Sequence, residues 1–167
     1  GTSILQSGTP FTAYTNAAFS PLTNSSGQFI GYAPGSGDYN ADGDNFDFPD
    51  VASYKYANTR KAYLTGIFAS SHAAALANFP APSTFGTEGN EAFNAFREPG
   101  FAEWDAAFLK NTKVTESVNF QLRFEFFNLF NRANLNTVDA NLPDGNFGRA
   151  TRQYSPRFLQ IGGNLTF

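Results

Sequence analysis

Apolar and polar side chains alternate most regularly in the last third of the chain. Between Glu116 and Phe126 the apolar positions are Val118, Phe120, Leu122, Phe124 and Phe126. The polar positions between them are Asn119, Gln121, Arg123 and Glu125. Successive side chains of a β-strand point to opposite faces, so a period of two is typical of a strand. The segment therefore predicts a strand with one phenylalanine-rich face and one polar face.

Other segments carry shorter patterns. The chain ends in a second predicted strand, Arg157–Phe167, with Leu159, Ile161, Leu165 and Phe167 on one face. Further strands are predicted at Trp104–Asn111, Thr12–Thr15 and Gln28–Ala33. The alanines of His72–Asn78 favour a short helix, whereas Arg60–Ser71 is compatible with helix or strand. We expect an all-β fold of antiparallel strands with long loops and at most one short helix.

Composition leaves two classes of β-protein open. Aromatic residues make up 17% of the chain, twenty residues are Phe, and only 15% are charged, against about 25% in an average soluble domain. The chain has no apolar run long enough for a transmembrane helix, and it has no cysteine, which excludes disulfides and thiolate metal sites. A phenylalanine-rich soluble β-protein fits this composition, and so does a β-protein whose outer face meets lipid.

Charge divides the chain near residue 50. Residues 1–50 contain five Asp and no Lys or Arg, whereas residues 51–167 contain eleven basic and nine acidic residues. We therefore expect a single unit, 1–167, with an acidic, loop-rich part at 1–50 and a strand-rich part at 51–167. No basic patch indicates nucleic-acid binding.

The acidic residues of 37–50 form the sharpest local motif. Asp38, Asn40 and Asp42 alternate and Gly43 follows, as at the start of an EF-hand calcium loop. The bidentate Glu expected at the twelfth position is replaced by Pro49, so Asp47 or Asp50 would have to substitute. The candidate Ca²⁺ ligands are Asp38, Asn40, Asp42, Asp44, Asp47 and Asp50. A solvated turn rich in Asp, Asn and Gly is the alternative interpretation.

Catalytic chemistry is not predicted. His72 is the single histidine and lies in an alanine-rich stretch, which favours a structural role. Motifs for nucleophilic, phosphate-binding, dinucleotide-binding and zinc-dependent enzymes are missing. Trp104 is expected to be a girdle or core aromatic rather than a sugar platform, and Asn128, Asn131 and Asn134 are expected to cap strand ends. We expect that the protein is not an enzyme.

The C-terminal residues carry a first resemblance. Gln160, Gly162, Leu165 and Phe167 follow the pattern polar, glycine, apolar, aromatic at the end of the chain. This pattern resembles the β-signal of bacterial outer-membrane proteins, which the barrel assembly machinery recognises. The resemblance implies a last strand that closes a barrel, because an open sheet edge is not tolerated in lipid.

A second resemblance covers about half of the chain. The stretches that carry it are QSGTPF (6–11), GDYNADGDNFDFPD (37–50), REPGFAEWDAAFLKNTKV (97–114), FQLRFEFFNLFNRANL (120–135) and NFGRATRQYSPRFLQIGGNLTF (146–167). They resemble the C-terminal barrel region of Oar-like TonB-dependent receptors, the group with a carboxypeptidase-regulatory-like domain. Glu98 departs from the glycine expected in the turn at 97–100.

The second resemblance implies a larger receptor. Such a receptor has a barrel of about 22 strands, a plug domain and a TonB contact motif, and this chain contains neither of the last two. Because the chain starts without Met and supplies only roughly five to seven strands, we expect it to be a fragment of a longer or processed chain. Its expected location is the bacterial outer membrane or cell surface. Its expected partners are the barrel assembly machinery and the rest of the receptor, and its role is to form wall and surface loops, with Asn119, Gln121, Arg123 and Glu125 facing the lumen.

Two other functions stay open from the sequence. A released piece could be the subunit of an extracellular filament, in which copies join by strand addition and calcium stabilises the contacts. A secreted, calcium-dependent sugar-binding module is the weaker alternative, because only Tyr32 and Tyr39 offer aromatic rings near the acidic motif.

Overall fold

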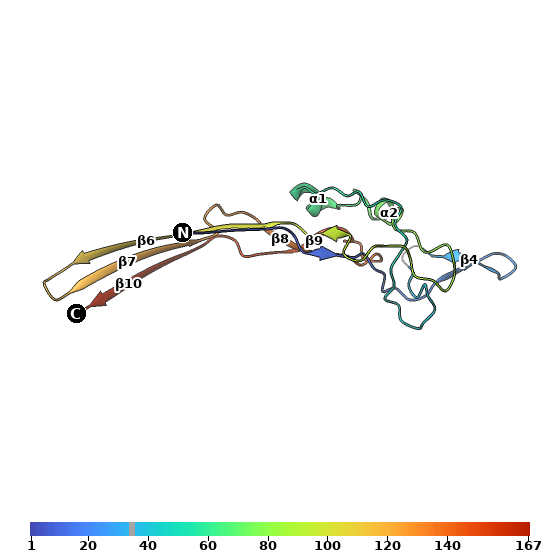
Figure 1. Cartoon of the computed structure of the whole chain (residues 1–167), viewed down its shortest axis with the longest axis horizontal. Helices are drawn as coiled ribbons and strands as arrows, with labels where there is room; N and C mark the ends of the chain where they lie inside the picture. Colours follow the sequence, from blue (N-terminus) through green and yellow to red (C-terminus); the bar gives the residue numbers. More distant parts are fainter. Residues whose placement is uncertain (34–35) are drawn as a thin grey trace. The chain divides into compact units, whose positions relative to one another are not determined.

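The chain folds mainly into antiparallel β-strands (Figure 1). The computed structural model describes residues 1–33 and 36–167, which fall into two compact units. Unit 1 contains Gly1–Ser7, Gly100–Asn134 and Gln153–Phe167, and unit 2 contains Gly8–Pro99 and Leu135–Arg152. In the part of the chain that is described, no helix is both long enough and apolar enough to cross a membrane.

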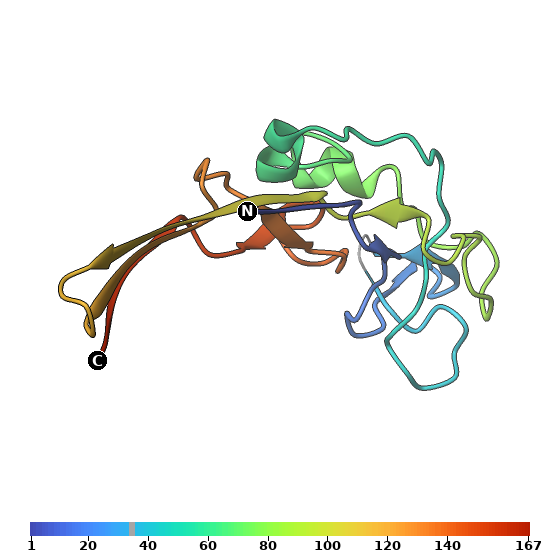
Figure 2. The same cartoon turned by 60° about the vertical axis from the view of Figure 1, so that its left-hand side comes forward.

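Unit 1 is a four-stranded sheet. Its strands are β1 (Thr2–Gln6), β6 (Phe101–Lys113), β7 (Asn119–Phe127) and β10 (Phe158–Thr166). They are hydrogen-bonded in the order β1-β6-β7-β10, each antiparallel to its neighbour. Strands that follow one another within unit 1 are therefore neighbours, which makes the sheet a meander. Figure 2 shows β6, β7 and β10 as one curved strip.

The connections of this meander differ at its two ends. β6 and β7 are joined by a tight turn, in which Val114 N–H donates to Val118 C=O over 2.9 Å. Because residues 114–118 form this turn, β7 begins at Asn119 and not at Glu116 as the alternation predicted. The long connections, β1 to β6 and β7 to β10, both leave from the opposite end, where Gln6 pairs with Phe101 and Phe127 pairs with Phe158.

Three asparagines fix the chain after β7, as expected for strand-end caps. Asn128 and Asn131 have positive φ angles of 52° and 51°, which asparagine tolerates better than most residues. Asn128 Nδ2 donates to Arg132 C=O, and Asn131 Oδ1 accepts from Arg157 N–H. The Asn134 side chain bonds both the N–H and the C=O of Ala102 in β6, at 3.1 and 2.9 Å.

Unit 2 consists of short elements joined by long loops. The elements are β2 (Pro10–Phe11), β3 (Pro21–Thr23), β4 (Phe29–Tyr32), α1 (Arg60–Thr65), α2 (His72–Leu76), β5 (Phe96–Arg97), β8 (Leu135–Val138) and β9 (Ala150–Gln153). The strands form three antiparallel pairs, β2 with β5, β3 with β4, and β8 with β9. Of the strand predicted at Thr12–Thr15, only single bridges are formed, from Tyr14 to Asn141 and from Thr15 to Asp47.

Residues 1–33 and 36–167 contain two short helices rather than at most one. α2 lies where the alanines predicted it, and α1 resolves the ambiguous segment that begins at Arg60. The Thr59 side chain accepts from Ala62 N–H and caps the start of α1. Gly66 ends α1 with a φ of 121°, a conformation that favours glycine.

Aromatic rings hold the core of unit 2 together. Phe68 lies 4.7 Å from Phe79, 4.8 Å from Phe96 and 5.1 Å from Phe147, measured between ring centroids. Phe147 belongs to the connection between β7 and β10, whereas the other three rings belong to the connection between β1 and β6. Two long connections of the sheet therefore share one core.

Candidate functional site

The apolar face of the sheet is the most extended surface feature of unit 1. Side chains of residues paired across neighbouring strands lie on the same face. The register places one residue each from β6, β7 and β10 side by side in four successive rows on this face. From the end with the long connections towards the tight turn, the rows are Ala106, Phe126 and Leu159; Phe108, Phe124 and Ile161; Lys110, Leu122 and Gly163; and Thr112, Phe120 and Leu165. Phe108 is 62% exposed and Ile161 is 64% exposed. In water such a face would be a large unprotected apolar patch.

The dimensions of this face suit a bilayer. Trp104 and Thr112 lie on this face, eight residues apart in β6, which corresponds to roughly 27 Å along a strand. A strand tilt of about 40° reduces this to about 20 Å along the membrane normal, close to the apolar band of outer-membrane barrels. Trp104 packs edge-on against Phe130, with centroids 5.4 Å apart, near one end of the band. The role of Trp104 as a girdle or core aromatic stays a prediction.

The other face of the sheet carries most of the polar residues, together with Leu109 and the paired Phe127 and Phe158. Asn119, Gln121, Arg123 and Glu125 alternate with the apolar residues of β7, as predicted. Gln121 Nε2 donates to Asn111 Oδ1 of β6 over 2.8 Å, and Arg123 forms an ion pair with Glu125. Gly162 lies opposite Arg123 and leaves open space there. This face can line the water-filled interior of a barrel.

The four predicted assembly-signal residues are divided between the two faces. Gln160 and Gly162 pair with Glu125 and Arg123 on the polar face, whereas Leu165 pairs with Phe120 on the apolar face. Phe167 follows the end of β10 and is 92% exposed. Among the described strands, β10 has a neighbour on one side only. Recognition of these residues by an assembly machinery stays a prediction.

The first four candidate calcium ligands fold back on their own loop. Each side chain accepts a backbone N–H a few residues further on, which makes a series of Asx-type turns. The bonds run from Gly43 N to Asp38 Oδ1 (3.3 Å), from Asp42 N to Asn40 Oδ1 (3.0 Å), from Asp44 N to Asp42 Oδ1 (2.8 Å) and from Phe46 N to Asp44 Oδ1 (3.1 Å). One oxygen of each side chain is therefore already engaged by the backbone.

The last two candidates are bonded differently from the first four. Asp47 is 1% exposed, and its Oδ2 accepts from Tyr39 N–H over 2.7 Å. Burial, and secondarily a hydrogen bond with the Glu88 carboxyl, raise the pKa of Asp47 to about 7. Asp50 Oδ1 accepts from Asn90 N–H over 2.8 Å. Over residues 1–33 and 36–167, no three Asp, Glu or His side chains are grouped as metal ligands, and calcium binding stays a prediction.

Two glutamates connect distant loops of unit 2 by hydrogen bonds. No sequence pattern indicated either of them. Glu88 Oε2 accepts from Phe48 N–H over 2.9 Å. Glu91 Oε1 accepts from Ala13 N–H over 2.7 Å, and its Oε2 is buried without a hydrogen-bond partner within the described chain. Burial raises the pKa of Glu91 to about 7. Both glutamates bind segments more than 35 residues away, so no local pattern marks them.

His72 joins α2 to the connection between β7 and β10. Its Nε2 lies 2.7 Å from the carbonyl oxygen of Leu142. Leu142 is fully buried in the core next to Phe147. This contact gives the histidine a structural role, in line with the prediction.

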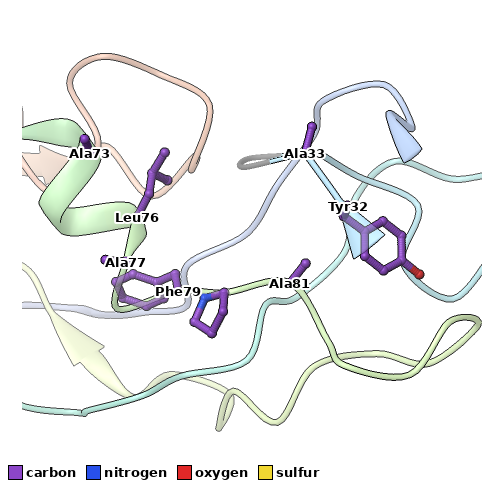
Figure 3. A pocket seen from close by; sticks show the side chains of 8 residues that line it. Tyr32, Ala33, Ala73, Leu76, Ala77, Phe79 and Ala81 are labelled. Atoms are coloured by element: carbon purple, nitrogen blue, oxygen red, sulfur yellow. The ribbon is translucent and has the colours of Figure 1, made fainter. Parts of the chain in front are cut away.

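An apolar pocket lies beside α2 (Figure 3). Its volume is about 450 Å³. The residues that line it are Tyr32, Ala33, Ala73, Leu76, Ala77, Phe79, Pro80 and Ala81. We call this hollow the α2 pocket. Its lining comes from sequence segments about 40 residues apart, so the sequence alone did not indicate it.

The comparisons with known proteins support the geometry of the sheet. The model of a family described as "Outer membrane beta barrel domain" matches residues 1–160. No curated protein matches the chain, and no solved structure does. The matched residues include β1, β6 and β7 of the two-faced meander and the first three residues of β10. The chain therefore belongs to the outer membrane beta barrel domain family and forms part of a barrel wall in the bacterial outer membrane.

Proposed function

We propose that the chain is the C-terminal barrel portion of a TonB-dependent receptor of the Oar-like kind. Its role is to form wall and surface loops of a gated importer, without covalent chemistry of its own. The observation that carries the proposal is the meander that ends in β10, with an apolar face for lipid and a polar face for the lumen. The five sequence stretches that resemble Oar-like receptors support the specific group.

The lengths of the connections at the two ends of the meander support one orientation of its strands across the membrane. Outer-membrane barrels have short turns on the periplasmic side and longer loops on the outside. The tight turn at Val114–Val118 and the C-terminal Phe167 then face the periplasm. The two connections that supply unit 2 leave from the outer end of the strands, so unit 2 belongs to the cell surface.

Labelling of single cysteines in intact cells tests this direction, because the chain has no cysteine of its own. A membrane-impermeant maleimide should label the exposed Ser25→Cys variant in unit 2. It should label Ser117→Cys in the tight turn only after the outer membrane is permeabilised. The reverse pattern would contradict the assigned direction.

Dependence on TonB requires a separate test with the whole receptor. The receptor should cross-link to TonB in cells with an energised inner membrane, and should cross-link much less when the proton gradient is collapsed. A receptor that assembles in the outer membrane but never cross-links to TonB would refute the TonB assignment and leave the barrel wall intact.

The barrel assembly machinery is the proposed partner of the C-terminal residues. Removal of Phe167, or Leu165→Asn, should lower the amount of folded receptor in the outer membrane. Thr166→Ser at the neighbouring position is the control and should leave the amount unchanged. Equal amounts of folded receptor for all variants would exclude a signal at these residues.

Self-assembly by strand addition is the second candidate, favoured by the outer edges of β1 and β10, which have no described neighbour. Electron microscopy of the purified chain in detergent-free buffer distinguishes the two roles. Ordered filaments would support an extracellular subunit. Aggregates that only detergent dissolves would support a wall segment, because an exposed apolar face requires lipid.

Calcium binding by Asp38, Asn40, Asp42 and the following aspartates is the third proposal. Asp38 and Asp44 each use only Oδ1 in the loop's own hydrogen bonds, so their second carboxylate oxygens are available to a cation. Ca²⁺ would reduce the repulsion among the carboxylates. Millimolar Ca²⁺ should raise the melting temperature of unit 2 and a chelator should reverse the change. The Asp38→Asn/Asp42→Asn variant should lose this response, and an unchanged melting temperature in the unmodified protein would mean a plain acidic turn.

A further inference from the structure

We propose that the α2 pocket binds a small, uncharged, hydrophobic molecule. This inference goes beyond the role of the chain in a barrel wall, and it does not depend on TonB. Pockets of about 300–1,000 Å³ hold small ligands, and the volume of about 450 Å³ lies in that range.

The pocket has a preformed floor. Phe79 is 3% exposed and is held by Phe68 and Phe147, whose ring centroids lie 4.7 and 5.1 Å away. Tyr32 is 8% exposed and packs edge-on against Tyr39 at 5.1 Å. Rings fixed by such contacts do not have to be ordered when a ligand enters, which lowers the entropic cost of binding.

Small side chains create the hollow. Four of the eight lining residues are alanines, at positions 33, 73, 77 and 81. Their side chains end at one methyl group, as Figure 3 shows for the labelled positions around the opening. Larger side chains at these positions would fill the space, so the volume depends directly on the sequence.

The lining selects against charge. None of the eight residues is charged, and the one polar side-chain group, the Tyr32 hydroxyl, already donates to Tyr39 C=O over 3.0 Å. A charged ligand would lose hydration without gaining a counter-charge. A hydrophobic ligand would remove carbon surface from water on both sides of the contact.

The apolar surface continues beyond the pocket. The Tyr32 ring also contacts Phe19, Phe29 and Phe85, with centroids 5.2 to 6.2 Å away. These three rings are 40–52% exposed and line a second, more open hollow of about 380 Å³. Rings on both sides of Tyr32 favour ligands that themselves contain a flat ring.

Protection of a single cysteine tests the proposal in the whole receptor reconstituted in lipid nanodiscs. The probe is naphthalene, and naphthalene-2-sulfonate is its charged counterpart. Naphthalene should slow the modification of Ala77→Cys by a charged methanethiosulfonate reagent, by a factor of about 1 + [L]/Kd at saturable concentrations. Ala74→Cys lies in α2, one turn before Ala77 and outside the pocket lining, and is the matched control, whose rate should not change.

A filling variant provides the second arm. Ala73→Leu combined with Ala77→Cys should abolish the protection while near-ultraviolet circular dichroism stays native. Ligand-observed NMR of the unmodified receptor, with and without Ala73→Leu, gives the same comparison without a cysteine. No saturable protection by naphthalene, equal protection by the sulfonate, or equal protection at Ala74→Cys would each overturn the proposal.

Discussion

Two carboxyl groups of unit 2 take up protons near neutral pH because of their surroundings. Glu91 accepts from Ala13 N–H, and Asp47 from Tyr39 N–H, at 2.7 Å each. Burial is the main reason why the pKa of each rises to about 7. These two side chains therefore make the stability of unit 2 sensitive to pH.

Stability should fall as these groups ionise. The pKa of Glu91 rises from 4.5 to about 7 on folding, so between these values the folded chain binds more protons than the unfolded chain. The free energy of unfolding must then decrease as the pH rises through this window and level off above pH 7. Asp47 acts in the same direction. Urea unfolding of unit 2 at pH 5 and pH 8 should show a lower midpoint at pH 8.

Glu91→Gln isolates one contribution to this pH dependence. The substituted amide keeps an oxygen for Ala13 N–H but does not titrate, so the difference between pH 5 and pH 8 should shrink. Glu116→Gln, in the exposed turn between β6 and β7, should keep the full difference. An unchanged pH dependence in Glu91→Gln would show that another group is responsible.

At the scale of elements, the strands of unit 1 are the part that the sequence predicted best. In β7 and β10 the apolar and polar residues lie on opposite faces of the sheet, so the period of two is visible in the sequence. The elements of unit 2 lack such a constraint. β2 and β5 are only two residues long, and they pair Phe11 with Phe96 across more than 80 residues of chain.

The two faces of β7 should respond differently to the same charge. Phe124 lies at mid-height of the apolar face, between Phe108 and Ile161, so Phe124→Arg should destabilise the folded barrel by about 2–4 kcal/mol. Gln121→Arg places the same side chain on the polar face and should cost less than about 1 kcal/mol. The free energies of unfolding in lipid vesicles provide the comparison. Equal losses would contradict the assignment of the faces.

The candidate sites of unit 1 were also easier to predict from the sequence than those of unit 2. The polar residues of β7 were predicted together, because alternation places them on one face. The acidic motif was visible as a motif, but Asp50 accepts from Asn90 N–H in another segment, which no local spacing reveals. The α2 pocket depends on Tyr32 and α2 meeting across about 40 residues, and sequence periodicity carries no information on such a meeting.

At the scale of the whole molecule, unit 2 is built jointly by two connections of the sheet. Ile67 N–H donates to Gly148 C=O over 2.9 Å, and Leu142 N–H donates to Tyr14 C=O over 2.8 Å. Gly148 has a φ of 77°, and a Cβ there would lie 2.9 Å from the Phe68 ring. The shorter connection is therefore fitted closely against the longer one.

Phe147→Ala should loosen both connections together. The ring is 3% exposed and fills the space beside Phe68 and Phe79, so its loss should cost about 3–5 kcal/mol. Hydrogen exchange should rise at residues 68–79 as well as at 142–149. Phe93→Ala, at a ring that is 76% exposed, is the control. Faster exchange confined to 142–149 would mean that the two connections fold independently.

The shared core also limits how barrels with these two connections can evolve by recombination. A crossover within the gene segment for β6 and β7 would combine the longer connection of one parent with the shorter connection of another. Phe147 and Gly148 of one lineage would then have to fit Phe68 and Phe79 of the other. Hybrids should keep a folded unit 2 only when both connections are inherited together, so the two connections should diversify as one block and not separately.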